Sequence, residues 1–168
     1  MNFILHPWHK YDPSVRDLLG LPRSTIMLKD LDKKNLQIND EVVFVSFHSS
    51  NQMVVWLVKD VEHEEKLAEE IEIEGPKQAL VANPTKGELV VCQWSDDDTF
   101  YRAVITDVNP TDKKVRVRFV DYGNQSVEPF GRVRELPDTL LKYPIMAKLM
   151  ALNGVPEHPI KDVGVANR

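Results

Sequence analysis

The stretch Phe119-Val120-Asp121-Tyr122-Gly123-Asn124 decides how this chain is interpreted. Together with Trp94 and Tyr101 it supplies four aromatic side chains and one amide. The surrounding pattern places these side chains at the rim of a small predicted β-barrel. Several aromatic faces around a hollow attract a cation that is bulky and weakly hydrated. The stretch therefore indicates a site for a methylated arginine or lysine side chain.

Short strand-like segments around this stretch predict the barrel. Four strands are expected, over residues 88–94, 100–108, 113–121 and 124–128. Strands this short, joined by tight turns, are typical of a strongly bent barrel. Alternation along the third strand puts Val115, Val117 and Phe119 on its inner face. We expect Gly123 to adopt a positive φ in the bend that follows Tyr122.

A hairpin and a helix are predicted before the barrel. Two β-rich segments, 41–48 and 53–58, flank a run of turn residues, which is the pattern of a hairpin. Asp60 can cap a helix that ends near Ile73. The predicted buried stripe of this helix comprises Val61, Leu67, Ala68 and Ile71.

The other face of the predicted helix is a dense run of Glu broken by Lys66, which we interpret as a solvated face. After the barrel, a helical turn is expected over 136–141 and a last apolar strand over 145–152. Near the N-terminus, residues 14–19 followed by Gly20 show the pattern of a short helix.

Composition and charge narrow the function classes. The chain has 168 residues, a formal net charge of −5 and a pI near 5.5. Binding to nucleic acid needs clustered positive charge, so these values favour a cationic partner. The single cysteine, Cys92, lies in an apolar run and is predicted to be a buried, inert thiol. No metal site is expected, and the absence of a membrane-span or signal-peptide pattern predicts an intracellular protein.

At four motifs the chain resembles the core of a Tudor domain, namely Gly87–Leu89, Phe100–Ala103, Val117–Asn124 and Leu136–Pro137. The segments on either side resemble the extended Tudor arrangement, in which the core is inserted into a staphylococcal-nuclease-like unit of OB type. The resemblance covers roughly residues 38–158. It implies a mainly β fold with minor α content, in which a helix links a five-stranded Tudor barrel to a partial nuclease-like unit.

The resemblance also implies a division of the chain. We expect an N-terminal extension (1–40), the first part of the nuclease-like unit with its linker helix (41–74), a linker (75–87), the Tudor core (88–141), and a truncated C-terminal part of the nuclease-like unit (142–168). The nuclease-like half of this family usually continues further, so the peptide groove between the two halves is less well defined by the sequence than the cage.

Extended Tudor domains bind symmetrically dimethylated arginine in the Arg-Gly or Arg-Ala tails of Piwi-type Argonaute proteins. By resemblance, the aromatic cage maps onto Trp94, Tyr101, Phe119 and Tyr122, with Asn124 as its polar member. The resemblance implies a methylarginine reader without catalytic residues or a cofactor. It further implies a germline scaffold for piRNA-mediated transposon silencing, located in the cytoplasm in perinuclear germ granules.

Other interpretations stay open at this point. Trp94 and Phe119, taken singly, can equally be core aromatics. The chain can also be a scaffold that binds its partners without regard to methylation, or a methyl-lysine reader. The nuclease-like half suggests an enzyme or RNA binder, but its hairpin lacks the acidic metal ligands of a nuclease. RNA contact would involve Arg116, Arg118, Arg132 and Arg134.

Overall fold

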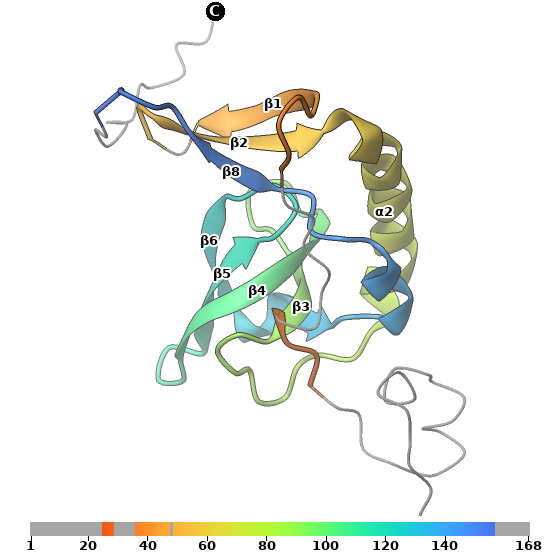
Figure 1. Cartoon of the computed structure of the whole chain (residues 1–168). Coiled ribbons are helices and arrows are strands. Elements are labelled where there is room, and N and C mark those ends of the chain that lie inside the picture. Colours follow the sequence, from red (N-terminus) through yellow and green to blue (C-terminus); the bar gives the residue numbers. More distant parts are fainter. Residues whose placement is uncertain (1–24, 29–35, 48, 157–168) are drawn as a thin grey trace, which may run out of the picture.

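Five antiparallel strands form the larger of two sheets in the computed structural model, which describes residues 25–28, 36–47 and 49–156. These strands are β3 (Leu89–Gln93), β4 (Phe100–Asn109), β5 (Lys114–Phe119), β6 (Gln125–Pro129) and β7 (Val133–Glu135). The spatial order is β6-β5-β4-β3-β7. Only the short helical turn η5 (Phe130–Arg132) joins β6 to β7, although they lie at opposite edges of the sheet. The sheet must therefore curl into a barrel (Figure 1).

The predicted strands of the barrel are confirmed, and β7 was missed. β7 has only three residues, and two of them, Arg134 and Glu135, are charged. So short a segment shows too little alternation of apolar and polar residues to predict a strand. Residues 79–81, inside the predicted linker, also pair with β7. Val81 donates its N–H to the Val133 carbonyl at 3.1 Å, and Glu135 donates to the Ala79 carbonyl at 2.9 Å.

The second sheet has the order β1-β2-β8, with β1 (Val42–Phe47), β2 (Gln52–Leu57) and β8 (Lys148–Ala151). The predicted hairpin is confirmed, and so is a strand near the C-terminal side of the barrel, although it is shorter than expected. Because β8 follows the barrel and pairs with β2, which precedes it, the barrel is inserted between the two parts of this sheet (Figure 1).

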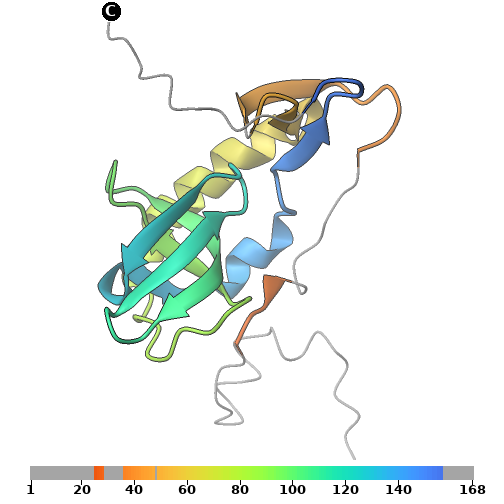
Figure 2. The same cartoon turned by 90° about the vertical axis from the view of Figure 1, so that its left-hand side faces the viewer.

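Helix α2 (Val61–Glu74) connects the two sheets and lies along the barrel (Figures 1 and 2). It begins where predicted, but the Asp60 side chain makes no capping hydrogen bond. Leu67 and Ile71 are buried as expected, whereas the prediction for Ala68 was wrong, because this residue is exposed. The inward stripe runs through Glu64, Leu67 and Ile71, at the i, i+3, i+7 spacing of one helix face.

Three more helical turns connect these elements, namely η3 (Val58–Asp60), η4 (Gly75–Lys77) and η6 (Asp138–Lys142). The last confirms the helical turn predicted near 136–141. Residues 1–24, 29–35, 48 and 157–168 lie outside the described residues, and with them the predicted helix over 14–19 and most of the predicted extension.

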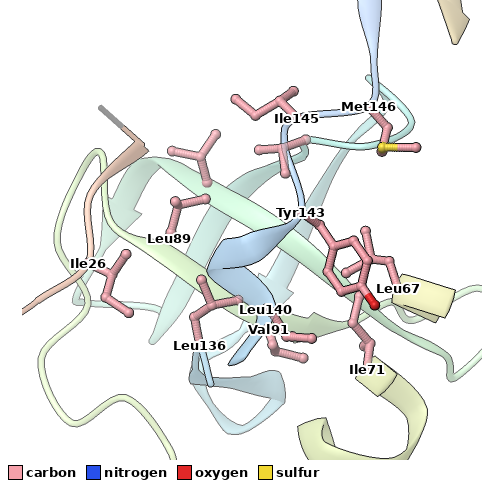
Figure 3. Close-up of a cluster of buried hydrophobic side chains, with 12 residues drawn as sticks. Ile26, Leu67, Ile71, Leu89, Val91, Leu136, Leu140, Tyr143, Ile145 and Met146 are labelled. Carbon is pink, nitrogen blue, oxygen red and sulfur yellow. The ribbon is translucent and has the colours of Figure 1, made fainter. Parts of the chain in front are cut away.

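Two hydrophobic clusters stabilise the fold. One fills the barrel with Val90, Val117 and their neighbours. The other lies between the barrel and α2, where Leu67 and Ile71 face Tyr143 (Figure 3). Ile26, in the predicted N-terminal extension, belongs to this second cluster and is only 4% exposed. The backbone around Ile26 also pairs with the start of β3.

Candidate functional site

The five predicted cage residues line one cavity. Its volume is about 300 Å³, and its lining consists of Trp94, Tyr101, Phe119, Tyr122 and Asn124 together with Val45 and Ser46 of β1. The aromatic rings meet edge to face or tilted, with centroid distances of 5.2 Å for Tyr101–Tyr122 and 5.7 Å for Trp94–Phe119. Ring pairs at these distances stabilise one another, so the rings form a continuous aromatic wall.

Two turns bring the cage residues together. Trp94 follows β3, and its N–H and carbonyl pair with Thr99 and Asp98 at 2.9 Å each, which returns the chain to Tyr101 at the start of β4. Phe119 ends β5, and its N–H donates to the Asn124 carbonyl at 2.9 Å across the following bend. The barrel therefore presents the ends of adjacent strands around one hollow.

Gly123 makes the second bend possible. Its φ is +87°, which confirms the predicted left-handed conformation. Its N–H donates to the Phe119 carbonyl at 2.7 Å. A Cβ at this position would lie 2.7 Å from Val54 Cγ2 of β2, so the second sheet also excludes a side chain here. Gly123 serves the backbone and the packing between the two sheets.

The cage residues differ in exposure. Phe119 is only 1% exposed and forms the floor of the cavity, continuing the row of Val115 and Val117 inside the barrel. Trp94, Tyr101, Tyr122 and Asn124 are half-buried. Phe119 is therefore both a core residue and a cavity residue, while the two tyrosines act as walls that reach the surface.

Both tyrosine hydroxyls of the cage donate to carboxylates. Tyr101 donates to Asp97 Oδ2 at 2.7 Å, and Tyr122 donates to Glu64 Oε1 of α2. Burial, and then the carboxylate that accepts the hydrogen bond, raise the pKa of each phenol. Both hydroxyls therefore stay protonated and continue to donate to the carboxylates of Asp97 and Glu64.

A buried ion pair fixes the chain next to the cage. Arg102 contacts Asp121 with two hydrogen bonds, from Nε at 2.9 Å and from Nη2 at 2.6 Å, and both side chains are almost fully buried. The remaining donors of the guanidinium reach the carbonyls of Leu140, Tyr143 and Pro144 at 2.8–3.0 Å. Asp121 is therefore a structural residue, because its carboxylate faces the interior and holds the turn that carries Tyr122.

The second sheet and the helix also contact the cage. Trp56 Nε1 donates to the Asp121 carbonyl at 2.6 Å, and its ring lies 5.4 Å from that of Tyr122. Trp56 is half-buried against the second cluster. Sequence reasoning missed Val45, Ser46 and Glu64 as neighbours of the cage, because they lie far from it in the sequence and carry no motif.

The predicted solvated face of α2 is only partly solvated. Besides Glu64, Glu70 accepts hydrogen bonds from Lys142 and from the Tyr143 hydroxyl, both at 2.7 Å. The bond from Lys142, and then the bond from Tyr143, lower the pKa of Glu70. The interpretation was wrong for these two positions because the helix lies against the barrel and η6, so acidic side chains at its margin find donors there.

Several residues outside the cage have structural or surface roles. Cys92 is buried inside the barrel, and burial raises the pKa of its thiol to about 12, which makes it a poor nucleophile. Asp98 pairs with Arg132 at 2.7 Å. Arg134 donates to the Gln78 carbonyl at 2.7 Å. Two of the four arginines proposed for RNA contact are thus engaged within the protein.

The described residues contain neither a metal site nor a membrane-spanning helix. Among them, no three His, Cys, Asp or Glu side chains are grouped so that they could hold a metal ion. Within the same residues, no helix combines the length and the apolar character that a membrane span requires.

Comparison with known proteins identifies what this chain resembles. The Tudor domain profile matches residues 34–154, which is well over half of the chain. Human Tudor domain-containing protein 1 is 34% identical over 74 residues, which is 44% of this chain and 6% of that protein. The matches span only 4–8% of the length of the curated relatives.

Two solved structures resemble the fold. The complex of Tudor with a symmetrically dimethylated Aubergine peptide has a TM-score of 0.58 and 28% identity, over 66% of each chain. The extended Tudor domain of human TDRD1, solved in complex with another symmetrically dimethylated peptide, has a TM-score of 0.61. Its identity is 22%, over 72% of this chain and 62% of that one. The fold described above is thus that of extended Tudor domains.

Proposed function

This chain belongs to the Tudor domain family, and from that premise we propose that it binds symmetrically dimethylated arginine through its aromatic cage. The observation that carries the proposal is the single cavity of about 300 Å³ into which Trp94, Tyr101, Phe119, Tyr122 and Asn124 converge. The similar Tudor structure, at 28% identity, was solved with a symmetrically dimethylated arginine peptide. The proposed role is that of a binding module without catalytic residues or a cofactor.

The chemistry of the cavity suits this ligand. Methylation keeps the charge of the guanidinium but removes N–H donors and adds methyl groups. Binding must then come from stacking and cation–π attraction, which contribute about 0.5–2 kcal/mol per favourable contact. The side-chain carbonyl of Asn124 can accept a remaining N–H and fix the orientation of the plane. Phe119 would support the group from below, with Tyr101 and Tyr122 beside it.

The planar shape of the group favours arginine over lysine. Guanidinium is flat and stacks on aromatic faces, whereas a methylated ammonium is rounder and has no such plane. A polar amide at one side of the cage gives a planar N–H a partner, which a trimethylated lysine cannot use. Methyl-lysine is therefore the weaker ligand in this proposal.

We propose as the partner the Arg-Gly-rich or Arg-Ala-rich tail of a Piwi-type Argonaute protein. The resemblance and the Aubergine peptide in the similar Tudor complex support this choice. The same reasoning proposes a scaffold for piRNA-mediated transposon silencing, located in cytoplasmic germ granules. Because the chain corresponds to a small fraction of its relatives, this role would belong to a module of a larger assembly. The proposed module comprises a barrel over 88–141 inserted between the segments 41–74 and 142–168.

Calorimetric titration tests the proposed function. Three versions of one Arg-Gly-rich peptide are compared, with the central residue unmodified arginine, symmetrically dimethylated arginine or trimethylated lysine. We expect the dimethylated arginine peptide to bind tightest, and Tyr122→Ala to remove that preference. Equal binding of the unmodified peptide would replace the proposal with a scaffold that ignores methylation. Preference for the lysine peptide would make the site a methyl-lysine reader.

A further inference from the structure

The two tyrosines of the cage donate their hydroxyls to carboxylates that do not line the cavity. Tyr122 donates its hydroxyl to Glu64, on a helix that precedes the barrel by more than a dozen residues. Tyr101 donates to Asp97, in the turn before β4. The two carboxylates thus hold the two tyrosine rings that form walls of the cavity.

A carboxylate that accepts a hydrogen bond from a phenol hydroxyl affects the aromatic ring in two ways. First, the hydroxyl lies in the plane of the ring, so a charge-assisted hydrogen bond to a fixed acceptor restricts how the ring turns. Second, an anionic acceptor polarises the O–H bond towards itself and leaves the ring richer in electron density. A ring richer in electrons attracts a cation over its face more strongly. Both consequences favour a positively charged ligand.

The two bonds differ in their surroundings. The bond between Tyr122 and Glu64 is partly buried, whereas the bond between Tyr101 and Asp97 is exposed. Electrostatic effects are stronger where water is excluded and weak where it is present. The contribution of Glu64 must therefore exceed that of Asp97.

We propose that Glu64 is a specificity-determining residue: its carboxylate positions Tyr122 and makes the cage select a cationic side chain. Asp97 acts in the same way on Tyr101 with a smaller effect. The helix α2 thereby contributes to ligand recognition although it supplies no lining residue of the cage cavity itself. This inference rests on the proposed function, because it concerns the affinity for the methylated guanidinium.

Calorimetric titration of variants with the dimethylated arginine peptide tests the inference. Glu64→Gln keeps the size of the side chain and removes its charge. We expect it to weaken binding on the order of tenfold, the effect of replacing a charge-assisted hydrogen bond by a neutral one to the glutamine amide oxygen. The matched control is Glu65→Gln, which removes the same charge from an exposed position of the same helix and is expected to change affinity less than about twofold.

A double variant separates an effect through Tyr122 from a general effect of charge. Tyr122→Phe keeps the ring and removes the hydroxyl and with it the whole hydrogen bond, so it should weaken binding at least as much as Glu64→Gln. The combination of both should bind no more weakly than Tyr122→Phe alone. Additive losses in the double variant, or equal losses for Glu64→Gln and Glu65→Gln, would overturn the inference.

A measurement without ligand keeps the inference separate from the proposed function. In the proton NMR spectrum we expect a slowly exchanging hydroxyl resonance of Tyr122. It should shift and exchange faster in Glu64→Gln, where the acceptor is a neutral amide oxygen, and be absent in Tyr122→Phe. If the wild-type protein ignores methylation, the proposed function fails, and this resonance alone decides whether Glu64 positions the ring. A wild-type spectrum without it shows that Glu64 does not hold Tyr122.

Discussion

The barrel and the three-stranded sheet differ in how completely they bury their own side chains. Inside the barrel Val90, Cys92 and Val117 are fully buried. On the three-stranded sheet Phe44 is 51% exposed and Leu149 is 60% exposed. The barrel thus has a complete interior of its own, while the sheet is packed on one side only. The cage lies where the two regions meet, with its rings on the barrel and its supports on the sheet and on α2.

This difference suggests a division of roles. The barrel provides stability and holds the aromatic rings on the ends of adjacent strands. The sheet and the helix contribute contacts that position single groups, such as Trp56 on the Asp121 carbonyl and Glu64 on the Tyr122 hydroxyl. Substitutions in the barrel should therefore reduce stability most, and substitutions on the three-stranded sheet should reduce it least.

Removal of the Arg102 side chain is expected to lower the free energy of unfolding most. Arg102→Ala leaves the Asp121 carboxylate buried without its partner and removes donors from three carbonyls. Breaking a buried pair on one side costs about 3–5 kcal/mol. Urea unfolding measures the loss, with Arg118→Ala as the control because that arginine is exposed on β5. A loss below about 1 kcal/mol would show that the pair does not fix the barrel.

A methyl group at the contact between the two regions should have the next largest effect. Gly123→Ala forces a non-glycine residue to a φ of +87° and places its Cβ 2.7 Å from Val54 Cγ2. Strained backbone of this kind costs about 1–3 kcal/mol. The control is Gly131→Ala, where a Cβ would meet nothing within 4 Å. Thermal unfolding compares the two variants, and equal melting temperatures would contradict the assigned role of Gly123.

The contact between α2 and η6 should contribute less to stability, and its contribution should depend on pH. Because hydrogen bonds from Lys142 and Tyr143 lower the pKa of Glu70 in the folded state, its contribution to stability is present above its ordinary pKa of 4.5. That contribution is lost as the pH falls below this value through the lowered pKa. For a partly exposed pair it amounts to less than about 1 kcal/mol. The difference in unfolding free energy between wild type and Glu70→Gln, measured at neutral and at low pH, should therefore disappear at low pH.

A substitution on the exposed face of the three-stranded sheet should change the free energy of unfolding least. Phe44 of β1 is half exposed, and its ring contacts that of Phe47 at a centroid distance of 4.8 Å. Phe44→Ser is expected to change the unfolding free energy by about 0.5 kcal/mol or less. A loss comparable to that of Gly123→Ala would show that the sheet is as important for stability as the barrel.

The sequence allowed the barrel to be predicted because its strands alternate and its turns are rich in turn-forming residues. Val115, Val117 and Phe119 lie inside as expected. β7 could not be predicted from three residues, and its pairing with residues 79–81 depends on closure of the barrel. The five proposed cage residues converge in one cavity, but Glu64 carries no local signal. Its role follows from how α2 packs on the barrel, and a single sequence cannot show that packing.

The most direct test of the proposed cage is NMR titration of the indole N–H signals with the symmetrically dimethylated arginine peptide. Trp94 lines the cavity, while the Trp56 indole lies outside it, bound to the Asp121 carbonyl and against the ring of Tyr122, so its signal should shift less. We predict a saturable shift of the Trp94 signal that exceeds the shift of Trp56 and that the unmodified peptide does not reproduce. An unchanged Trp94 signal on saturation with the dimethylated peptide, or equal shifts with both peptides, would contradict the assignment of the cage as a methylarginine site.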